Sequence, residues 1–582
     1  MIQPEFKPLI DILSGKLFSI PEYQRHYSWT NKQRTDLFKD ILKLLKAREI
    51  YEDRVHFMAT LVCLKTHDKK QIGSNSFFIY EVVDGQQRLT TLIILLKAIS
   101  KRLFIEKQFD EEKELNKILL KDDGRLIILQ NNHDNRMLLR NYLKDGSIPN
   151  EIDIKTIADE NISQAIKQCE KFVNSSAIDT ISLLSLVKNY LYFIFQSLED
   201  KGAVYTIFEV LNSRGLDVDW LDKCKSMLMG LLYEYSLGLD SSIFDEHLKS
   251  LHSYWSNIYR EIGLQSISGQ EIIRFAATLK QNSDAGRPIS AEDALEFFRD
   301  HSTSKKVANI VIKTVEEDTI WIKQVTSALS ILYKDKRRNA VTEITQARLL
   351  AVAIMLRNDL SQEDRDRLLE QWEKTTFRIY GLLDNDARVK VGDYVRVAKT
   401  IYKDKTISVI NLIKLIADIG KEYSIEDAII ALEKKDCYTS WKKELRYFFF
   451  RYEEYLSKQS NIQIDNVAWN IIWKNNLNDT IEHILPQDIR QKCWSNNFTD
   501  IQHKEFLNTL GNLCLLSQPL NAEAKNSCFN TKKETYIKTT LLSNRNIINK
   551  EDGSLRQEWK LEEIQIRTRK LLEFAKEEWK DI

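Results

Sequence analysis

The pattern of apolar and polar positions differs between three parts of the chain. Near the N-terminus, the stretches "VHFMATLVCL" (55–64) and "FFIYEVVDG" (77–85) are rich in β-branched and aromatic residues, which is typical of strands. Pieces with helical spacing lie around them. Residues 1–110 are therefore predicted to form an α/β domain.

A long helical region is predicted over residues 111–460. Apolar residues recur at spacings of three and four in "ISLLSLVKNYLYFIFQSL" (181–198) and "RLLAVAIMLRN" (348–358). This period places them on one face of a helix. The region is expected to complete the N-terminal module and to link it to the C-terminal part.

The composition changes again in residues 461–582, where asparagines become frequent and "LGNLCLLS" (510–517) has the character of a strand. The last stretch, 555–582, has the spacing of an amphipathic helix and is expected to pack back on the body. We predict a separate small α/β unit here. With 582 residues the chain exceeds what one hydrophobic core usually supports, so the whole is predicted to be multidomain and mainly α.

Composition and charge exclude few partners. Apolar residues make up 43% of the chain, with only 17 Gly and 7 Pro, which indicates a folded protein and not a fibrous or disordered one. Lys plus Arg (85) and Asp plus Glu (84) nearly cancel, so the net charge neither suggests nor excludes a nucleic acid. No basic start precedes an apolar run, and no run is long enough to span a membrane. We expect a soluble cytoplasmic protein with no membrane partner.

The seven cysteines never form a CxxC pair, which argues against a zinc ribbon and against a disulfide framework. Reduced thiols in a cytoplasm are expected. Cys224, Cys514 and Cys528 are expected to be small buried hydrophobes. The C-terminal unit should then be held together by packing alone.

A strand, a tight turn and a helix follow one another in "IYEVVDGQQRLTTLIILLKAI" (79–99). The backbone N–H groups of residues 86–89 would lie at the helix N-terminus, where free donors and the helix dipole favour an anion such as phosphate. Further candidate contacts are Arg88, Thr90 and Thr91. The alternative is that Asp84 merely caps the helix.

Two other stretches accompany this turn. In "IPEYQRHYSWT" (20–30), Arg25 stands among three aromatic residues, an arrangement that is costly to order unless the arginine is held against rings or an anion. In "FEVLNSRGLDVDWLDKCKSML" (208–228), one helix ends with Asn-Ser-Arg-Gly and another begins.

Taken together, "IPxYQRxYxW", "VDGQQRLTTL" and "FxxLNxRG" (within 203–228) resemble the N-terminal domain of GmrSD-type proteins, the modification-dependent (type IV) restriction endonucleases. The resemblance implies a ParB/sulfiredoxin-like domain that binds and hydrolyses a nucleoside triphosphate, with GTP, ATP and UTP all open. It implies a nucleotide site made of Arg25, Asp84, Gly85, Gln86, Gln87, Arg88, Thr90 and Thr91. The matching residues of the third motif, expected to buttress that site, are Phe208, Asn212 and Gly215. No GxxxxGK[ST] occurs, which excludes a P-loop.

Near the C-terminus, "TIEHILPQ" (480–487) contains an adjacent glutamate and histidine. Such a pair is by itself more often a surface pair or a satisfied histidine. Adjacent residues on a strand point to opposite faces, so a kink or bulge would be needed to aim both at one phosphate. Downstream, "LGNLCLLSQPLNAEAKNSCFNTKKETY" (510–536) supplies Asn512 after a glycine, Asn521 near the start of a predicted helix, and several lysines.

The order "EHxxP", "GNLxLL", Asn and "F..K...Y" resembles an HNH (His-Me finger, ββα-metal) nuclease in its GmrSD-type form. The resemblance implies that Glu482 and Asn521 bind Mg²⁺ or Mn²⁺ and that His483 is the general base. Asn512 would pin the histidine-bearing loop, and Lys532 would lie near the scissile phosphate or hold the helix. In such a site one divalent ion stabilises the leaving oxygen while the neutral imidazole takes a proton from water. Segment 521–550, with six basic and two acidic residues, is a candidate patch for backbone phosphates.

We therefore predict a nucleotide-dependent DNA endonuclease of type IV restriction that cuts modified phage DNA, with DNA and a nucleoside triphosphate as partners and a homodimer as a possible assembly. Two alternatives stay open. One is a ParB-like nucleotide-binding, DNA-binding or regulatory protein with an inactive HNH fold. The other is an abortive-infection nuclease that acts on host DNA or RNA.

Overall fold

The computed structural model describes residues 4–72, 75–121, 126–131, 136–175, 178–199, 219–236, 241–265, 267–282, 286–341, 343–550 and 552–581. The chain divides into a first compact unit, Met1–Gln281 with Ile289–Ser330, and a second, Asn282–Pro288 with Ile331–Ile582. Most described residues are helical and the N-terminal region is α/β, which confirms the coarse prediction. The boundaries near residues 110 and 460, and the ParB/sulfiredoxin-like and HNH folds, stay predictions.

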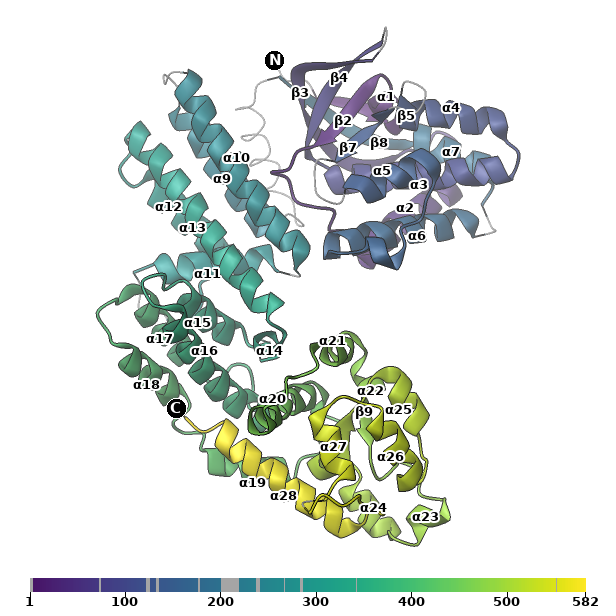
Figure 1. Cartoon of the computed structure of the whole chain (residues 1–582). Coiled ribbons are helices and arrows are strands. Elements are labelled where there is room, and N and C mark those ends of the chain that lie inside the picture. The colour runs from purple at the N-terminus through teal and green to yellow at the C-terminus, as the bar shows by residue number, and fades with distance from the viewer. Residues whose placement is uncertain are drawn as a thin grey trace. The chain divides into compact units, whose positions relative to one another are not determined.

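The first unit contains a mixed six-stranded sheet (Figure 1). The order of its strands is β1 (Glu5–Pro8), β8 (Leu191–Leu198), β3 (His56–Ile72), β4 (Asn75–Asp84), β2 (Lys16–Ile20) and β7 (Leu129–Asn131). Neighbours pair in parallel except in β1–β8 and β3–β4, which are antiparallel. The two predicted strand stretches thus correspond to β3 and β4. A separate short ladder joins β5 (Leu120–Lys121) to β6 (Leu126–Ile127).

The prediction of one helix over residues 181–198 is wrong in its second half. Helix α7 (Thr180–Asn189) ends there and β8 begins, with Leu191, Phe193 and Phe195 buried at alternate positions. Aromatic and β-branched residues favour a strand, and β8 is paired on both sides, by β1 and by β3. The sequence of this stretch therefore fits two patterns, the helical spacing of three and four and the alternation of buried and less buried residues that is typical of a strand.

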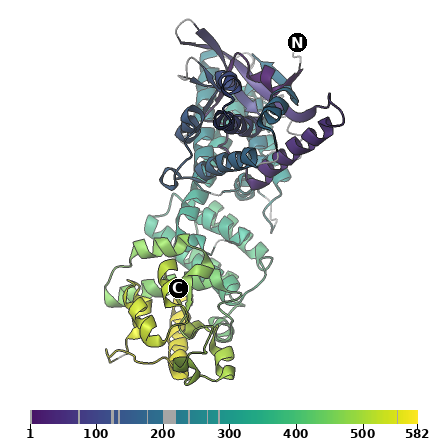
Figure 2. The ribbon, with the colours of Figure 1, turned by 90° about the vertical axis from the view of Figure 1, so that its right-hand side faces the viewer.

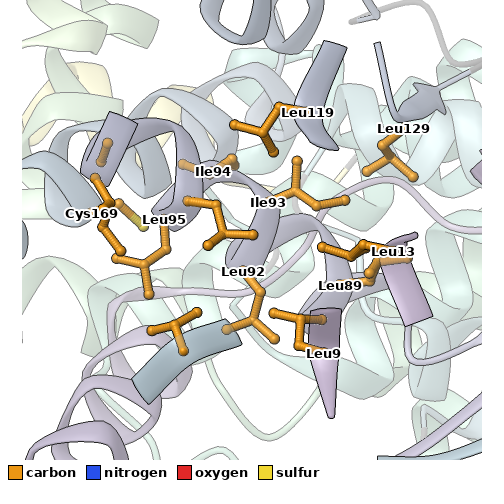
Figure 3. Packing of buried hydrophobic residues seen from close by; sticks show 14 of the residues in the cluster. Leu9, Leu13, Leu89, Leu92, Ile93, Ile94, Leu95, Leu119, Leu129 and Cys169 are labelled. Atoms are coloured by element: carbon orange, nitrogen blue, oxygen red, sulfur yellow. The ribbon is translucent and has the colours of Figure 1, made fainter. Parts of the chain in front are cut away.

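Helix α3 (Gln86–Ile105) runs through the core of the first unit. It packs against α4 (Phe109–Leu119) and α6 (Ile157–Asn174). Figure 3 shows its apolar side chains surrounded by residues of other elements. Leu92 and Ile93, on different faces, are both fully buried, so the helix is buried on more than one side. This burial fixes the position of the turn at its N-terminus.

The other helices described between residues 9 and 334 are α1 (Leu9–Leu13), α2 (Asn31–Arg48), α5 (Arg136–Asp145), α9 (Trp220–Tyr235), α10 (Ser241–Leu264), α11 (Gly269–Lys280), α12 (Ala291–Thr303) and α13 (Ala308–Lys334), with a 3₁₀ turn at Glu151–Asp153. Several begin at a side-chain cap. Asp219, for example, caps α9 by accepting a hydrogen bond from the backbone N–H of Leu221 (2.8 Å).

The described residues of the second unit, green to yellow in Figure 2, are mainly helical, with one small ladder and one isolated bridge between Asn549 and Leu555. Its first helices are α14 (Lys336–Asn339), α15 (Thr345–Met355), α16 (Gln362–Thr376), the π-helix η2 (Phe377–Leu382), α17 (Val391–Lys403), α18 (Val409–Ile419), α19 (Ile425–Glu433) and α20 (Lys442–Ser460). The helix predicted around residues 348–358 corresponds to α15 and is confirmed.

The C-terminal part contains α21 (Asn466–Lys474), α22 (Leu477–Thr480), β9 (Ile481–His483), α23 (Lys492–Ser495), α24 (Asp500–Phe506), the 3₁₀ turn η3 (Leu510–Asn512), β10 (Leu513–Leu515), α25 (Gln518–Ala524), α26 (Phe529–Ile537), α27 (Leu542–Ile548) and α28 (Leu561–Glu578). The tail helix α28 packs against α19 and η3, as predicted. No helix in the described ranges combines the length and the apolar character needed to cross a bilayer.

Two cysteines differ from the prediction of reduced thiols. Cys493 and Cys528 form a disulfide, with Cα atoms 5.9 Å apart. Cys528 is half-buried and bridged, not a buried free thiol, because it lies at the N-cap of α26 beside α23. Cys224 and Cys514 are buried and free, as predicted. The C-terminal part is therefore held by a covalent bond in addition to packing.

Candidate functional sites

Strand β9 carries Glu482 and His483 and pairs antiparallel with β10, where Leu513 lies opposite His483 and Cys514 opposite Glu482. The ladder is regular over its three residues, so the kink expected between the two side chains is not seen in it. They leave the strand on opposite faces. Helices α23 and α24 and the turn η3 lie between β9 and β10 in the chain, and helices α25 and α26 follow β10.

Glu482 is buried and bonded to α26. Its Oε1 accepts hydrogen bonds from Lys532 Nζ (2.6 Å) and from the hydroxyl of Tyr536 (3.2 Å). Burial raises the pKa of the Glu482 carboxyl, and the Lys532 ammonium opposes that rise. Lys532 is itself fully buried and also donates to the carbonyl of His483 (2.5 Å). These contacts are those of a residue that holds the helix to the strand, the second of the two roles predicted for Lys532.

His483 is 6% exposed, and its Nε2 lies 3.0 Å from Oδ1 of Asn508. The amide of Asn508 is oriented by Asp436, whose carboxylate accepts a hydrogen bond from Asn508 Nδ2 (3.0 Å). An amide oxygen can only accept, so Nε2 carries the proton and Nδ1 keeps its lone pair. The ring centroid of Tyr438 lies 4.3 Å from that of His483.

Burial lowers the pKa of His483 to about 4, and the Lys532 ammonium acts in the same direction. The hydrogen bond to Asn508 opposes this shift without reversing it. The imidazole is therefore neutral at pH 7, which is the state that a general base requires.

Asn512 is fully buried and binds the loop that follows His483. Its Oδ1 accepts from the backbone N–H of Leu485 (2.7 Å), and its Nδ2 donates to the carbonyls of Leu485 (3.0 Å) and Leu507 (2.8 Å). All three of these hydrogen bonds join the Asn512 amide to backbone groups. The side chain thereby fixes the path of the chain just beyond the histidine.

Asn521, on α25, is half-buried beside the start of β9. Its Nδ2 donates hydrogen bonds to the carbonyls of Asp479 (3.0 Å) and Ile481 (3.4 Å). Its Oδ1 is the atom that could coordinate a metal ion. In the part of the chain that the structure describes, no three His, Cys, Asp or Glu side chains gather to hold a metal ion. One carboxylate, one amide oxygen, and oxygens of water or phosphate form a donor set that suits Mg²⁺ or Mn²⁺ better than zinc.

In the basic patch predicted over residues 521–550, fewer basic side chains are free to bind a phosphate than the sequence contains. Lys532 is buried, Lys538 pairs with Glu523, and Lys533 donates to the carbonyl of Arg556 (3.0 Å). Half of its basic side chains are therefore engaged within the protein.

In the first unit, Gly85 begins α3 in the left-handed conformation, with φ of 86°. A Cβ there would lie 2.9 Å from Cδ1 of Leu61 and 3.1 Å from the carbonyl oxygen of Thr60. The turn therefore requires glycine both for its backbone conformation and for space. The helix cap is Gly85, with no side-chain cap bond, so the alternative that Asp84 caps the helix is wrong.

Gln87 and Thr91 join the second motif to the first. Gln87 accepts from the backbone N–H of Ser28 (2.8 Å) and donates to the carbonyl of His26 (3.0 Å). The hydroxyls of Thr91 and Tyr27 lie 2.8 Å apart. Both side chains were predicted to lie at the nucleotide, but in this structure their hydrogen bonds hold the two motifs against each other. Gln86 and Thr90 are buried, and Oε1 of Gln86 has no partner among the described residues.

Arg25 is held by a carboxylate and not by the neighbouring rings. Its Nε lies 3.3 Å from Oδ2 of Asp222, whose Oδ1 accepts from the hydroxyl of Tyr259 (2.5 Å). Burial raises the pKa of Asp84, while the positive charges of Arg88 and Arg25 lower it. The fold thus brings Arg25 and Arg88 close enough to Asp84 for both charges to act on its carboxyl.

A cavity of about 500 Å³ opens beside Arg25. Its lining includes polar residues that the sequence interpretation missed, which are Asn161, Asp219, Asp222 and Tyr259. The signal for two of them was "DVDWLD" (217–222), directly after the third motif, since a spacing of three puts both aspartates on one side of the start of α9. Asn212 and the third motif itself, 208–215, lie outside the described residues.

Helix α9 also contacts the first motif through Lys225, which is buried and donates to the carbonyl of Tyr23 (3.2 Å) and to Oε1 of Gln24 (3.3 Å). Burial lowers the pKa of Lys225 to about 8. The segment with Arg25 is therefore fixed from α3 on one side and from α9 on the other.

Both sites lie in ranges that match known families. Residues 9–229 match the family model "GmrSD restriction endonuclease, N-terminal domain", and residues 423–574 match "GmrSD restriction endonucleases, C-terminal domain". No curated protein matches the chain. The first range includes Arg25 and the turn at Gly85, and the second includes His483.

Proposed function

Because the chain belongs to the GmrSD restriction endonuclease family, we propose that it hydrolyses DNA at His483 with a divalent cation, under the control of a nucleotide bound in its N-terminal region. We propose modified phage DNA as its target. Cleavage of invading DNA would take place in the cytoplasm. Since each chain supplies one hydrolytic site, cutting both strands favours a homodimer.

The observation that carries the proposal is the contact between Nε2 of His483 and Oδ1 of Asn508, which are 3.0 Å apart. The imidazole is neutral at pH 7, its Nε2 proton is committed to Asn508, and Nδ1 is left to accept a proton. This tautomer supports a general base that takes a proton from the attacking water at Nδ1. Asn508 then stabilises the imidazolium, because its Oδ1 still accepts from Nε2–H.

The remaining residues position this base and the phosphodiester. Asn512 fixes the loop after His483, and the buried ammonium of Lys532 favours the ionised form of Glu482. Asn521 supplies an oxygen atom that would hold Mg²⁺ or Mn²⁺, which when bound neutralises the phosphodiester and stabilises the leaving oxygen. Glu482 leaves β9 on the face opposite His483 and is bonded to Lys532, so to bind the same ion it would have to exchange this contact for the metal, with a change in the conformation of β9.

For the nucleotide, the support comes from charge and from the helix start. Arg25 and Arg88 are positively charged neighbours of the N-terminus of α3, where backbone donors favour phosphate. A phosphate that binds Arg25 competes with Asp222, and this competition is the means by which the nucleotide would change the arrangement around α9.

The test is a cleavage panel with purified full-length protein. The substrates are modified phage DNA, the same DNA without modification, host DNA and RNA, each with and without Mg²⁺ and with and without each nucleoside triphosphate. We expect metal-dependent cutting of modified DNA that responds to nucleotide. His483→Ala should abolish it, whereas Asn530→Ala, exposed on α26, should cut like wild type.

Other outcomes identify the alternatives. Cleavage of host DNA or RNA in preference to modified DNA indicates an abortive-infection nuclease. Nucleotide binding with no cleavage of any substrate indicates a regulatory protein with an inactive nuclease fold. Wild-type cutting by the His483→Ala protein would reject the assigned base.

A further inference from the structure

A second cavity of about 500 Å³ lies in the second unit, lined by the C-terminal half of α20, by Asn546, Asn549, Lys550 and Arg556, and by α28. Neither Glu482 nor His483 lines it. Its volume falls in the range of small-molecule sites.

A buried arginine, Arg567 of α28, lines this cavity with only 8% of its surface exposed. Its Nη1 donates to the carbonyls of Gly511 (2.8 Å) and Leu513 (2.7 Å). Its Nη2 is closed to solvent and has no hydrogen-bond partner in the described part of the chain, so an anion in the cavity would reach it only after the side chain moves. The ring of Phe449 lies 5.4 Å from the guanidinium carbon, which favours the positive charge but offers no strong acceptor. A buried guanidinium with an unused donor is costly unless an anion approaches it.

Four basic residues (Lys550, Arg556, Arg567 and Lys570) and three acidic residues (Glu563, Glu573 and Glu577) line the cavity, which is an excess of one positive charge. Arg556 is neutralised by Glu563, with Nε 2.7 Å from the carboxylate. Glu577 pairs with Lys580, outside the cavity. Lys550 adds an exposed ammonium to the lining, and its side chain makes no ion pair among the described residues.

An aromatic wall completes the lining. The rings of Tyr455 and Phe574 lie 5.1 Å apart, and Tyr452 is buried beside them. Aromatic rings next to an unsatisfied guanidinium suit a ligand that has both a planar ring and an anionic group.

We propose that this cavity binds a free nucleotide, with its phosphate on Arg567 and Lys550 and its base against Tyr455. This site is distinct from the nucleotide site proposed at Arg25, which is in the other unit.

The same arginine ties the cavity to the hydrolytic site. The carbonyls bound by Arg567 belong to Gly511 and Leu513, the residues on either side of Asn512. Asn512 in turn holds the loop after His483. A phosphate on Nη2 would therefore act through Arg567, as a positioning residue, on the backbone that orients the base. Only this coupling rests on the proposed nuclease function; the binding does not.

Hydrogen–deuterium exchange of the full-length protein tests the binding by location. With adenosine or guanosine 5′-monophosphate at about 1 mM, we expect slower exchange in residues 450–460, 546–556 and 563–577. Lys550→Glu, which reverses an exposed charge, should weaken this protection about tenfold. Arg567→Lys keeps a charge near the carbonyls and should weaken it similarly, while Arg569→Glu, exposed on the same helix, should leave it unchanged.

Two results would overturn the proposal. One is the absence of protection in all three segments with every nucleotide. The other is protection that Lys550→Glu and Arg567→Lys do not change. Protection by a single-stranded oligonucleotide but by no free nucleotide would reject a small ligand and would assign the cavity to the path of the nucleic acid. A protein that binds nucleotide here but cuts no DNA would leave this site standing and reject the proposed function alone.

Discussion

Lys532 and Glu482 form a buried ion pair that fastens α26 to β9, with Nζ 2.6 Å from Oε1. Lys532 is fully buried and Glu482 is 5% exposed, so neither charge is solvated by bulk water. The pair is stable only because each charge offsets the desolvation of the other. If helix α26 separates from β9, one of the two charges either becomes exposed or stays buried without its partner.

Removing one partner should be strongly destabilising. We expect Lys532→Ala to lower the free energy of unfolding of the second unit by about 3–5 kcal/mol, because it leaves a buried carboxylate unpaired. Lys533→Ala, on the same helix, removes contacts to the backbone of Arg556 and to Gln557 and should cost less than about 1.5 kcal/mol. Denaturant unfolding measures both, and equal losses would contradict the role given to the pair.

The acidity of His483 can be measured directly. We expect its imidazole resonances to titrate in NMR with a midpoint near pH 4, because burial lowers its pKa to about 4. A midpoint near 6.5, its usual value, would show that the ring is solvated and not held as described.

This shift has a consequence for stability. Since the folded pKa lies below the unfolded one, the unfolded chain binds the proton more tightly between about pH 6.5 and 4. The free energy of unfolding should therefore fall as pH drops through that window, by about 3 kcal/mol from this group alone. His483→Gln should reduce this dependence.

Asn512→Asp tests the hydrogen bonds by which Asn512 holds the loop after His483. The aspartate keeps an acceptor for the N–H of Leu485 but turns an oxygen toward the carbonyls of Leu485 and Leu507. We expect a loss of about 2–4 kcal/mol in unfolding free energy and a fall in cleavage. Asn496→Asp, exposed at the end of α23 and outside segment 521–550, is the matched control and should change neither.

Gly85→Ala should destabilise the first unit. The left-handed backbone costs an alanine about 1–2 kcal/mol, and its Cβ would overlap Leu61 as well. Gly553→Ala is a matched control, because Gly553 has a φ of 78° but no atom within 4 Å of the added Cβ. If both variants lose the same stability, the space around Gly85 is not limiting.

The disulfide should strengthen the C-terminal part. The bridge between Cys493 and Cys528 spans 35 residues, and closing such a loop stabilises a fold by about 3–4 kcal/mol. We expect reduction, or Cys493→Ser, to lower the melting temperature of the second unit. Peptide mapping without reductant should recover the two cysteines linked, and free thiols at both positions would contradict the pairing.

The turn at Gly85 and the strands β3 and β4 could be predicted because their signals are local: β-branched and aromatic runs, then Asp-Gly before a helix. The strand β8 could not, since its sequence fits both periods and its pairing with β1 and β3 decides between them. At the proposed hydrolytic site, Glu482, His483 and Asn512 were named from short motifs. Asn508 and Asp436, which fix the tautomer, carry no motif, and Asp436 is far from His483 in sequence. Only the fold brings such residues together.

The hydrogen bonds that Arg567 donates to the backbone around Asn512 have a consequence for synthesis of the chain. The carbonyls of Gly511 and Leu513 receive their donor from a helix that ends at Glu578, so a nascent chain lacks this support until the ribosome has moved past that point. A truncated translation product would keep every residue of the proposed hydrolytic site and still leave its backbone unsupported. A chain that ends before Arg567 therefore contains the proposed hydrolytic residues without the helix that supports the backbone around Asn512.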